Sequence, residues 1–142
     1  MNYATVVDLE NRMGATVMAH LAEDNGTVNP DAAADALQAA QSEIDAHLAG
    51  RYEVPVVTPV DSAAGRILQA ATLDIAEYRL HLRKPPVFPE ILRKADRALA
   101  LARAVVEGHT TLPGIPQRTA DRLLARAVGA PRELTTAELQ DL

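Results

Sequence analysis

The sequence predicts an all-α fold, a compact bundle of four to five helices followed by an extended or partly helical C-terminal tail. Apolar residues make up 48% of the 142 residues, but there are only one Phe, three Tyr and no Trp. The core must therefore consist of Ala, Leu, Val and Ile, a composition that favours close-packed helices over a sheet. Apolar positions also recur at spacings of three and four, between residues that start and stop helices.

The first helix is expected after Thr5, whose hydroxyl can cap it. Asp8 lies in its first turn, where the helix dipole favours negative charge. Gly14 interrupts this helix, and a second helical piece covers residues 15–22 before a turn at 24–26.

Asn29 followed by Pro30 predicts the next helix start, with an N-cap and a proline at the first helical position. An apolar stripe then runs to about Arg51, and Pro55 and Pro59 keep the following segment extended. The stripe consists of Ala33, Leu37, Ala40, Ile44 and Leu48.

Asp61 or Ser62 is expected to cap the third long element, which carries apolar residues on two sides. One side holds Ile67, Ala71, Ile75, Tyr78 and Leu82. Leu73 and Leu80 project from the other side. Such a helix is either central to the bundle or shared with a neighbouring subunit.

The last long helix is predicted over residues 89–107, with Gly108 as its C-terminal cap. Prolines and glycines interrupt the pattern from residue 113 onward. We therefore expect a bundle domain over residues 1–112 and a C-terminal tail over residues 113–142.

Charge is distributed unevenly along the chain, whose formal net charge is -5. Residues 1–61 contain two basic and ten acidic residues, whereas residues 66–103 contain eight basic and four acidic ones. One interpretation is that each charged face is simply solvated. The other is that unlike faces meet between neighbouring copies, which suits a heterologous ring.

No pattern of catalytic or metal-binding residues emerges, so we expect neither an enzyme nor a cofactor. The chain has no Cys, and its four histidines form no HxxxH or HExxH pair. The phosphate-binding glycine patterns and GxSxG are absent.

A DNA-binding role is disfavoured by the pI of about 5.3 and the scarcity of aromatic residues. No apolar run reaches the roughly 20 residues that span a bilayer, so no membrane association is expected.

A proline-terminated helix end, IDAHLAGRYEVP, is the most distinctive local pattern in the chain. Its marked residues are Ile44, Asp45, Leu48, Arg51, Tyr52 and Pro55. We interpret Arg51 and Tyr52 as a tie between the helix end and the core, because guanidinium reaches carbonyls or carboxylates and tyrosine combines an apolar body with a polar tip.

Together with Tyr3-Ala4-Thr5, Asp74-Ile75-Ala76 and Gly108, this pattern resembles the phage Mu-type family of small helical virion proteins, over roughly residues 3 to 112. That family has long been catalogued as a domain of unknown function, and it is similar to the head-to-tail adaptor, or connector, proteins of tailed phages.

The resemblance implies a non-enzymatic virion protein, assembled in the host cytoplasm, that forms a ring beneath the portal in the phage neck. Its partners would be the portal, the next neck or tail-terminator protein and further copies of itself, in a dodecameric ring that DNA crosses without specific binding. The isolated chain would be a monomer. Alternatives are a head-completion or tail-terminator component of the next layer, or a small helical regulator that binds a host protein or DNA.

Two sets of residues are candidates for contacts in such an assembly. The subunit-interface candidates are Asp31, Asp35, Asp45, Leu73, Leu80, Arg93 and Arg97. The portal-docking candidates are Arg118, Arg122 and Arg126, which recur at four-residue spacing in the tail.

Overall fold

The computed structural model describes residues 2–118 of the chain. These residues form five helices and one hairpin, whose two strands are each two residues long. In chain order the elements are α1 (Val6–Met13), α2 (Ala15–Ala22), β1 (Glu23–Asp24), β2 (Thr27–Val28), α3 (Ala32–Leu48), α4 (Ala63–His81) and α5 (Pro89–Glu107). The predicted all-α bundle is confirmed, and the predicted turn at 24–26 closes the small antiparallel hairpin, in which Glu23 pairs with Val28.

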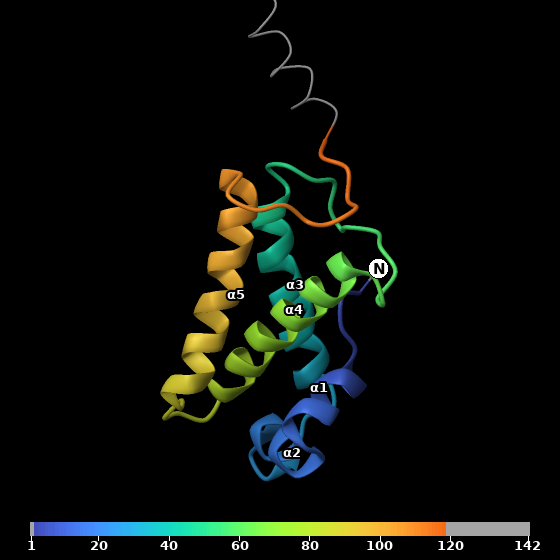
Figure 1. The fold of residues 1–142 in the computed structure, drawn as a ribbon. Helices are drawn as coiled ribbons and strands as arrows, with labels where there is room; N and C mark the ends of the chain where they lie inside the picture. The colour runs from blue at the N-terminus through green and yellow to red at the C-terminus, as the bar shows by residue number, and fades with distance from the viewer. Residues whose placement is uncertain (1, 119–142) are drawn as a thin grey trace, which may run out of the picture.

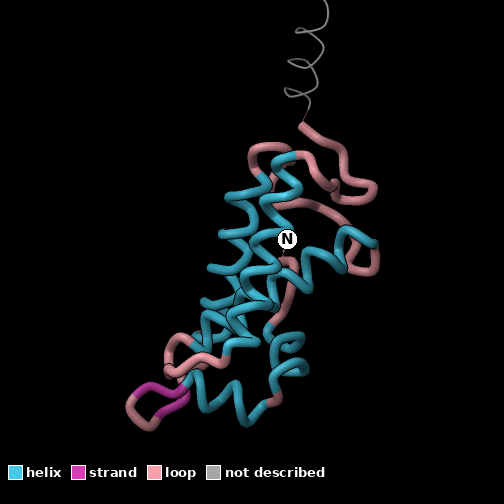
Figure 2. The backbone as a smooth tube through the Cα atoms, turned by 60° about the vertical axis from the view of Figure 1, so that its left-hand side comes forward, coloured by secondary structure: helices cyan, strands magenta, loops and turns pink. Residues whose placement is uncertain are grey.

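The three long helices α3, α4 and α5 pack against one another, and α1 and α2 cover one end of this group (Figure 1). The hairpin projects at the same end, as Figure 2 shows. The segments that follow α3 and α5 lie together at the opposite end (Figure 1). No helix among residues 2–118 has the length and apolar character that crossing a bilayer requires.

Local capping groups set the helix boundaries near the predicted positions. Thr5 and Asp8 form a reciprocal capping box at the start of α1, and the hydrogen bonds from Thr5 lower the pKa of the Asp8 carboxyl. Ser62, rather than Asp61, caps α4 by accepting a hydrogen bond from the Gly65 amide at 3.0 Å. α5 runs over the predicted residues and ends at Gly108, whose φ of 84° is the left-handed conformation that glycine favours.

α3 is shorter at both ends than the predicted span from Pro30 to Arg51. The side chain of Asn29 accepts a hydrogen bond from the Asp31 amide at 3.0 Å, which closes a turn before the helix begins. At the other end, the carbonyl of Leu48 accepts bonds from the amides of both Arg51 and Tyr52. The bond from Arg51 spans three residues in place of four, so the chain tightens after Leu48, where the regular helix ends.

α4 is the central helix of the bundle, since it packs against α1, α2, α3 and α5. This position explains why it is apolar on two sides. Its buried residues include Leu68, Ile75, Ala76 and Leu80, which join alanines and leucines of the neighbouring helices in one core.

At the start of α4, backbone atoms of Pro59 and Val60 approach Gly65 so closely that they leave no room for a side chain there. A Cβ atom there would lie 2.1 Å from the carbonyl oxygen of Pro59 and 2.8 Å from that of Val60. At Gly50 an added Cβ would lie 3.5 Å from the nearest side-chain atom, Cγ1 of Val106, which is an ordinary contact.

We predict that Gly65→Ala lowers the free energy of unfolding by about 3 kcal/mol, because backbone atoms must move to admit the methyl group. The matched variant Gly50→Ala should change it by less than about 1 kcal/mol. Urea unfolding of both variants measures these values. Equal losses at the two positions would contradict the steric explanation.

Candidate functional site

The hydroxyl of Tyr3 joins three parts of the chain at one buried point. It donates a hydrogen bond to Oδ1 of Asp45 on α3, and it accepts one from the amide of Val56 at 2.7 Å. The Tyr3 amide in turn donates to Oε1 of Gln41 at 3.1 Å. Because Tyr3 is only 4% exposed, these bonds fix the N-terminal segment to α3 and to the segment beyond it.

The surroundings of Tyr3 keep its phenol neutral. Burial, and next the hydrogen bond to Asp45, raise the pKa of the Tyr3 hydroxyl well above its ordinary value. Only the neutral phenol can donate to the carboxylate and accept from the Val56 amide at the same time. The protonated state is therefore the one that holds this junction together.

Tyr52 forms a second junction, just beyond the C-terminal end of α3. Its side chain is 1% exposed, and its hydroxyl accepts a hydrogen bond from the amide of Leu112 at 3.2 Å. The guanidinium of Arg51 lies against Gly108 at the end of α5, where a Cβ atom would come within 2.9 Å of Nη2. Arg51 thus reaches the last turn of α5, rather than the end of its own helix or an acidic side chain, and its charge lies near the negative end of the α5 dipole.

The first residues of the predicted tail lie on the bundle. The amide of Arg118 donates to the carbonyl of Arg51 at 2.8 Å, and its Nη1 donates to the carbonyl of Ala49 at 2.9 Å. The portal-docking candidate Arg118 is therefore held at the C-terminal end of α3. The other two candidates, Arg122 and Arg126, lie outside the described residues.

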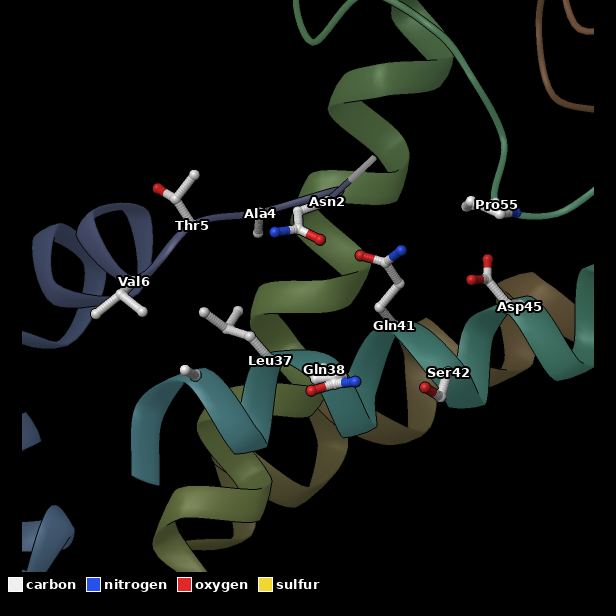
Figure 3. A pocket seen from close by; sticks show the side chains of 11 residues that line it. Asn2, Ala4, Thr5, Val6, Leu37, Gln38, Gln41, Ser42, Asp45 and Pro55 are labelled. Atoms are coloured by element: carbon white, nitrogen blue, oxygen red, sulfur yellow. The ribbon is translucent and has the colours of Figure 1, made fainter. Parts of the chain in front are cut away.

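An open groove of about 580 Å³ runs between the N-terminal segment and α3 (Figure 3). In Figure 3 the Gln41 side chain points toward Asn2, and that of Asp45 points toward Pro55. Asp45 is the only ionisable side chain in the lining, and Tyr3 already binds it. The other lining residues are Ala4, Thr5, Val6, Ala34, Leu37, Gln38 and Ser42. The groove thus brings together no pair of groups suited to acid–base catalysis.

Within residues 2–118 no three His, Asp or Glu side chains are placed to hold a metal ion. Two of the histidines have separate local partners. Nδ1 of His81 lies 3.0 Å from the carbonyl of Glu77 on its own helix. His109 lies 3.5 Å from the Glu107 carboxylate at the exposed end of α5.

Part of the charge asymmetry is neutralised within the subunit, through Glu23, Asp24 and Glu43. Ion pairs connect the acidic N-terminal half to basic residues of α4 and the turn after it, and they connect Arg12 of α1 back to α4. The pairs are Arg12 with Asp74 and with Glu77 (3.3 Å), Arg79 with Glu43 (2.7 Å), Arg83 with Asp24 (2.5 Å) and Lys84 with Glu23 (3.9 Å). The basic residues at the end of α4 therefore orient α2 and the hairpin against the bundle.

Four interface candidates remain on the surface and outside any ion pair in the described part of the chain. Asp31 and Asp35 are exposed at the start of α3. Arg93 and Arg97 are exposed on α5. The acidic pair and the basic pair therefore lie on two different helices, which pack against each other and against α4.

The other three interface candidates have positions inside the subunit. Leu73 and Leu80 are 9% and 0% exposed, so both side chains belong to the subunit's own core. Asp45 is bound by Tyr3. The second apolar side of α4 arises because this helix is surrounded by its neighbours, and these leucines offer no area to another copy that keeps this fold.

Sequence reasoning missed the role of Tyr3. Its hydroxyl meets partners 42 and 53 positions away, and no local pattern reports such a contact. The one available signal was an aromatic residue two positions before a helix cap in a chain with few aromatic residues, because a buried tyrosine hydroxyl needs a polar partner.

Comparison with protein families gives a match. The family model described as Bacteriophage Mu, Gp36 matches residues 3–126, which is well over half of the chain. The match extends 14 residues beyond Leu112, from the bundle into the tail. A comparison with curated proteins gives no match.

We predict that Tyr3→Phe lowers the free energy of unfolding by about 1–3 kcal/mol, because the buried Val56 amide loses its acceptor and Asp45 loses its donor. Tyr78→Phe is the matched control, since its half-buried hydroxyl makes no hydrogen bond to a described residue. The control should change stability by less than about 0.5 kcal/mol. Guanidinium unfolding measures both, and equal effects would contradict the role assigned to Tyr3.

The raised pKa of Tyr3 also predicts a difference at alkaline pH. Above pH ~10, tyrosine ionises in the unfolded chain while Tyr3 stays protonated in the folded one, so the unfolded state gains stability. The advantage of the wild type over Tyr3→Phe should be constant below pH ~10 and shrink above it. Unfolding curves of both proteins between pH 8 and 11 test this, and an advantage that grows with pH would refute it.

Proposed function

Because the chain belongs to the Bacteriophage Mu Gp36 family, we propose that it is a structural virion protein, a head-to-tail adaptor that forms a ring beneath the portal. Family membership identifies a phage protein, and the bundle provides a rigid building block. Nothing in the geometry of residues 2–118 gathers reactive groups, which favours assembly over catalysis as the role.

The observation that supports this proposal most strongly is the pattern of charges that remain unpaired. Asp31 and Asp35 on α3 and Arg93 and Arg97 on α5 are exposed and have no ionic partner among the described residues. A head-to-tail contact would pair the acidic side of one copy with the basic side of the next. Repeated with a closing rotation, such a heterologous contact generates a ring.

One end of the subunit is suited to contact a different protein. The segment after α3 exposes valines there, and Val57 is 79% exposed. Residues 109–118 lie at the same end and lead into the tail (Figure 1). We assign this end to the portal, with the tail arginines pairing with acidic groups on it.

We predict that Arg97→Glu and Asp35→Lys each reduce the yield of tailed particles on the order of tenfold when they replace the wild-type protein, because each puts like charges across the seam. The double variant should recover much of the loss, since the attraction is restored with reversed sign. Arg66→Glu, an exposed position on α4, serves as the control and should leave the yield unchanged. Electron microscopy of particles counts heads with and without tails. Loss in the control alone, or no recovery in the double variant, would count against the charge pairing.

The neck layer is tested separately by cryo-electron microscopy of the virion and by binding to purified portal protein. An adaptor should occupy the layer in contact with the portal and bind it directly, whereas Arg122→Glu/Arg126→Glu should bind it at least about tenfold more weakly as favourable charge pairs are lost. A protein of the next layer would not bind the portal. Finding the chain outside the neck would refute the proposal.

A further inference from the structure

An exposed aromatic side chain stands at the start of α5. Phe88 is the only phenylalanine of the chain and the N-cap residue of α5, yet it is 69% exposed. Leu82, at the end of α4, is 49% exposed, and Leu92, one helical turn beyond Phe88, is 41% exposed. The bundle core does not use this side chain, so the apolar surface at the turn between α4 and α5 is left for another contact.

An apolar groove of about 170 Å³ lies elsewhere on the same chain, between α1, α2, β2 and the start of α3. Its floor includes the buried side chains of Ala22 and Ala33, and its walls include Val6, Met18 and Val28. An apolar cavity of about 150 Å³ is known to bind benzene. The groove is therefore large enough for one phenyl ring.

Phe88 of the same subunit does not contribute to the lining of this groove. The turn before Phe88 nevertheless contacts α2, since Nε of Arg83 donates to the carbonyl of Leu21 at 2.9 Å. The charges around the two features are complementary. Glu10 lines the groove, and Asp31 directly follows its lining residue Pro30.

The phenylalanine is accompanied on α5 by the exposed Arg93 and Arg97, and the neighbouring Glu90 is the one acidic residue in the same turn. A second copy of this chain thus offers both an aromatic ring of suitable size and the opposite charge.

We propose that Phe88 of one subunit inserts into the groove between α1, α2 and α3 of the next. Each subunit then has one Phe88 knob and one groove, so the contact is head-to-tail and continues from copy to copy. This inference rests on the proposed ring and adds the residues that form its seam. The apolar contact supplies attraction, and the flanking charges orient it.

The absence of cysteine allows a direct test with the full-length protein. Phe88→Cys and Ala19→Cys, the latter in the groove lining, are purified separately, mixed and oxidised gently. Mixed disulfide dimers should form at least about tenfold faster than in two control mixtures, because a specific contact raises the effective concentration of the thiols. The controls combine each variant with Val57→Cys, an exposed position at the opposite end of the subunit. Non-reducing gels measure the rates.

Equal rates in the test and control mixtures would overturn the inference. So would faster dimerisation of Phe88→Cys with itself, because that result indicates a twofold contact in place of a head-to-tail one. The neck position is measured independently in virions. A chain found in the neck whose test mixture behaves like the controls keeps the adaptor function and loses this seam. A fast test mixture with a chain absent from the neck keeps the seam and refutes the adaptor.

Discussion

The hydrogen bonds of two buried tyrosines hold the whole architecture in register on α3. Tyr3 fastens the N-terminal segment to Asp45 and Val56, and Tyr52 fastens the segment after α5 to the end of α3. Both side chains have an apolar ring that fills space and one polar atom that would be costly to bury alone. The satisfied hydroxyls therefore select one arrangement among the many ways in which alanine-rich helices can pack.

This dependence follows from the composition of the core. Alanine and leucine bury surface without directional preference, so they stabilise a bundle but specify its geometry weakly. The hydrogen bonds of the tyrosines and the ion pairs of Arg12, Arg79 and Arg83 supply the missing direction. Tyr52 of the helix-end pattern and the arginines Arg79 and Arg83 are in this chain positioning groups for the fold.

The internal ion pairs also define what the subunit has left to offer a partner. The charges that remain outside these ion pairs include Asp31 and Asp35 at the start of α3 and Arg93 and Arg97 on α5. An exposed phenylalanine and an apolar groove accompany them at the end that α1 and α2 cover. Binding to a partner that covers the exposed apolar surface and pairs these charges would stabilise the folded subunit. This is consistent with a phage family protein proposed to act in an assembly.

The sequence by itself determined the helical class and most helix limits, because these depend on groups within four residues of each other. Thr5 with Asp8, Ser62 with Gly65, and Gly108 after α5 are local capping interactions that can be read from neighbouring letters. The sequence also indicated that the IDAHLAGRYEVP stretch is a structural feature. Tertiary structure alone decided which side of α4 is buried, since Leu73 and Leu80 are enclosed by helices distant in the chain.

Tertiary structure also decided the partners of Tyr3 and the separation of paired from unpaired charges. Arg12 and Asp74 lie 62 positions apart, and periodicity within one helix carries no information on how another helix is placed against it. Helix formation is a local equilibrium, whereas burial and pairing depend on the relative placement of whole elements. That physical difference is why the helices could be predicted and the surface available to a partner could not.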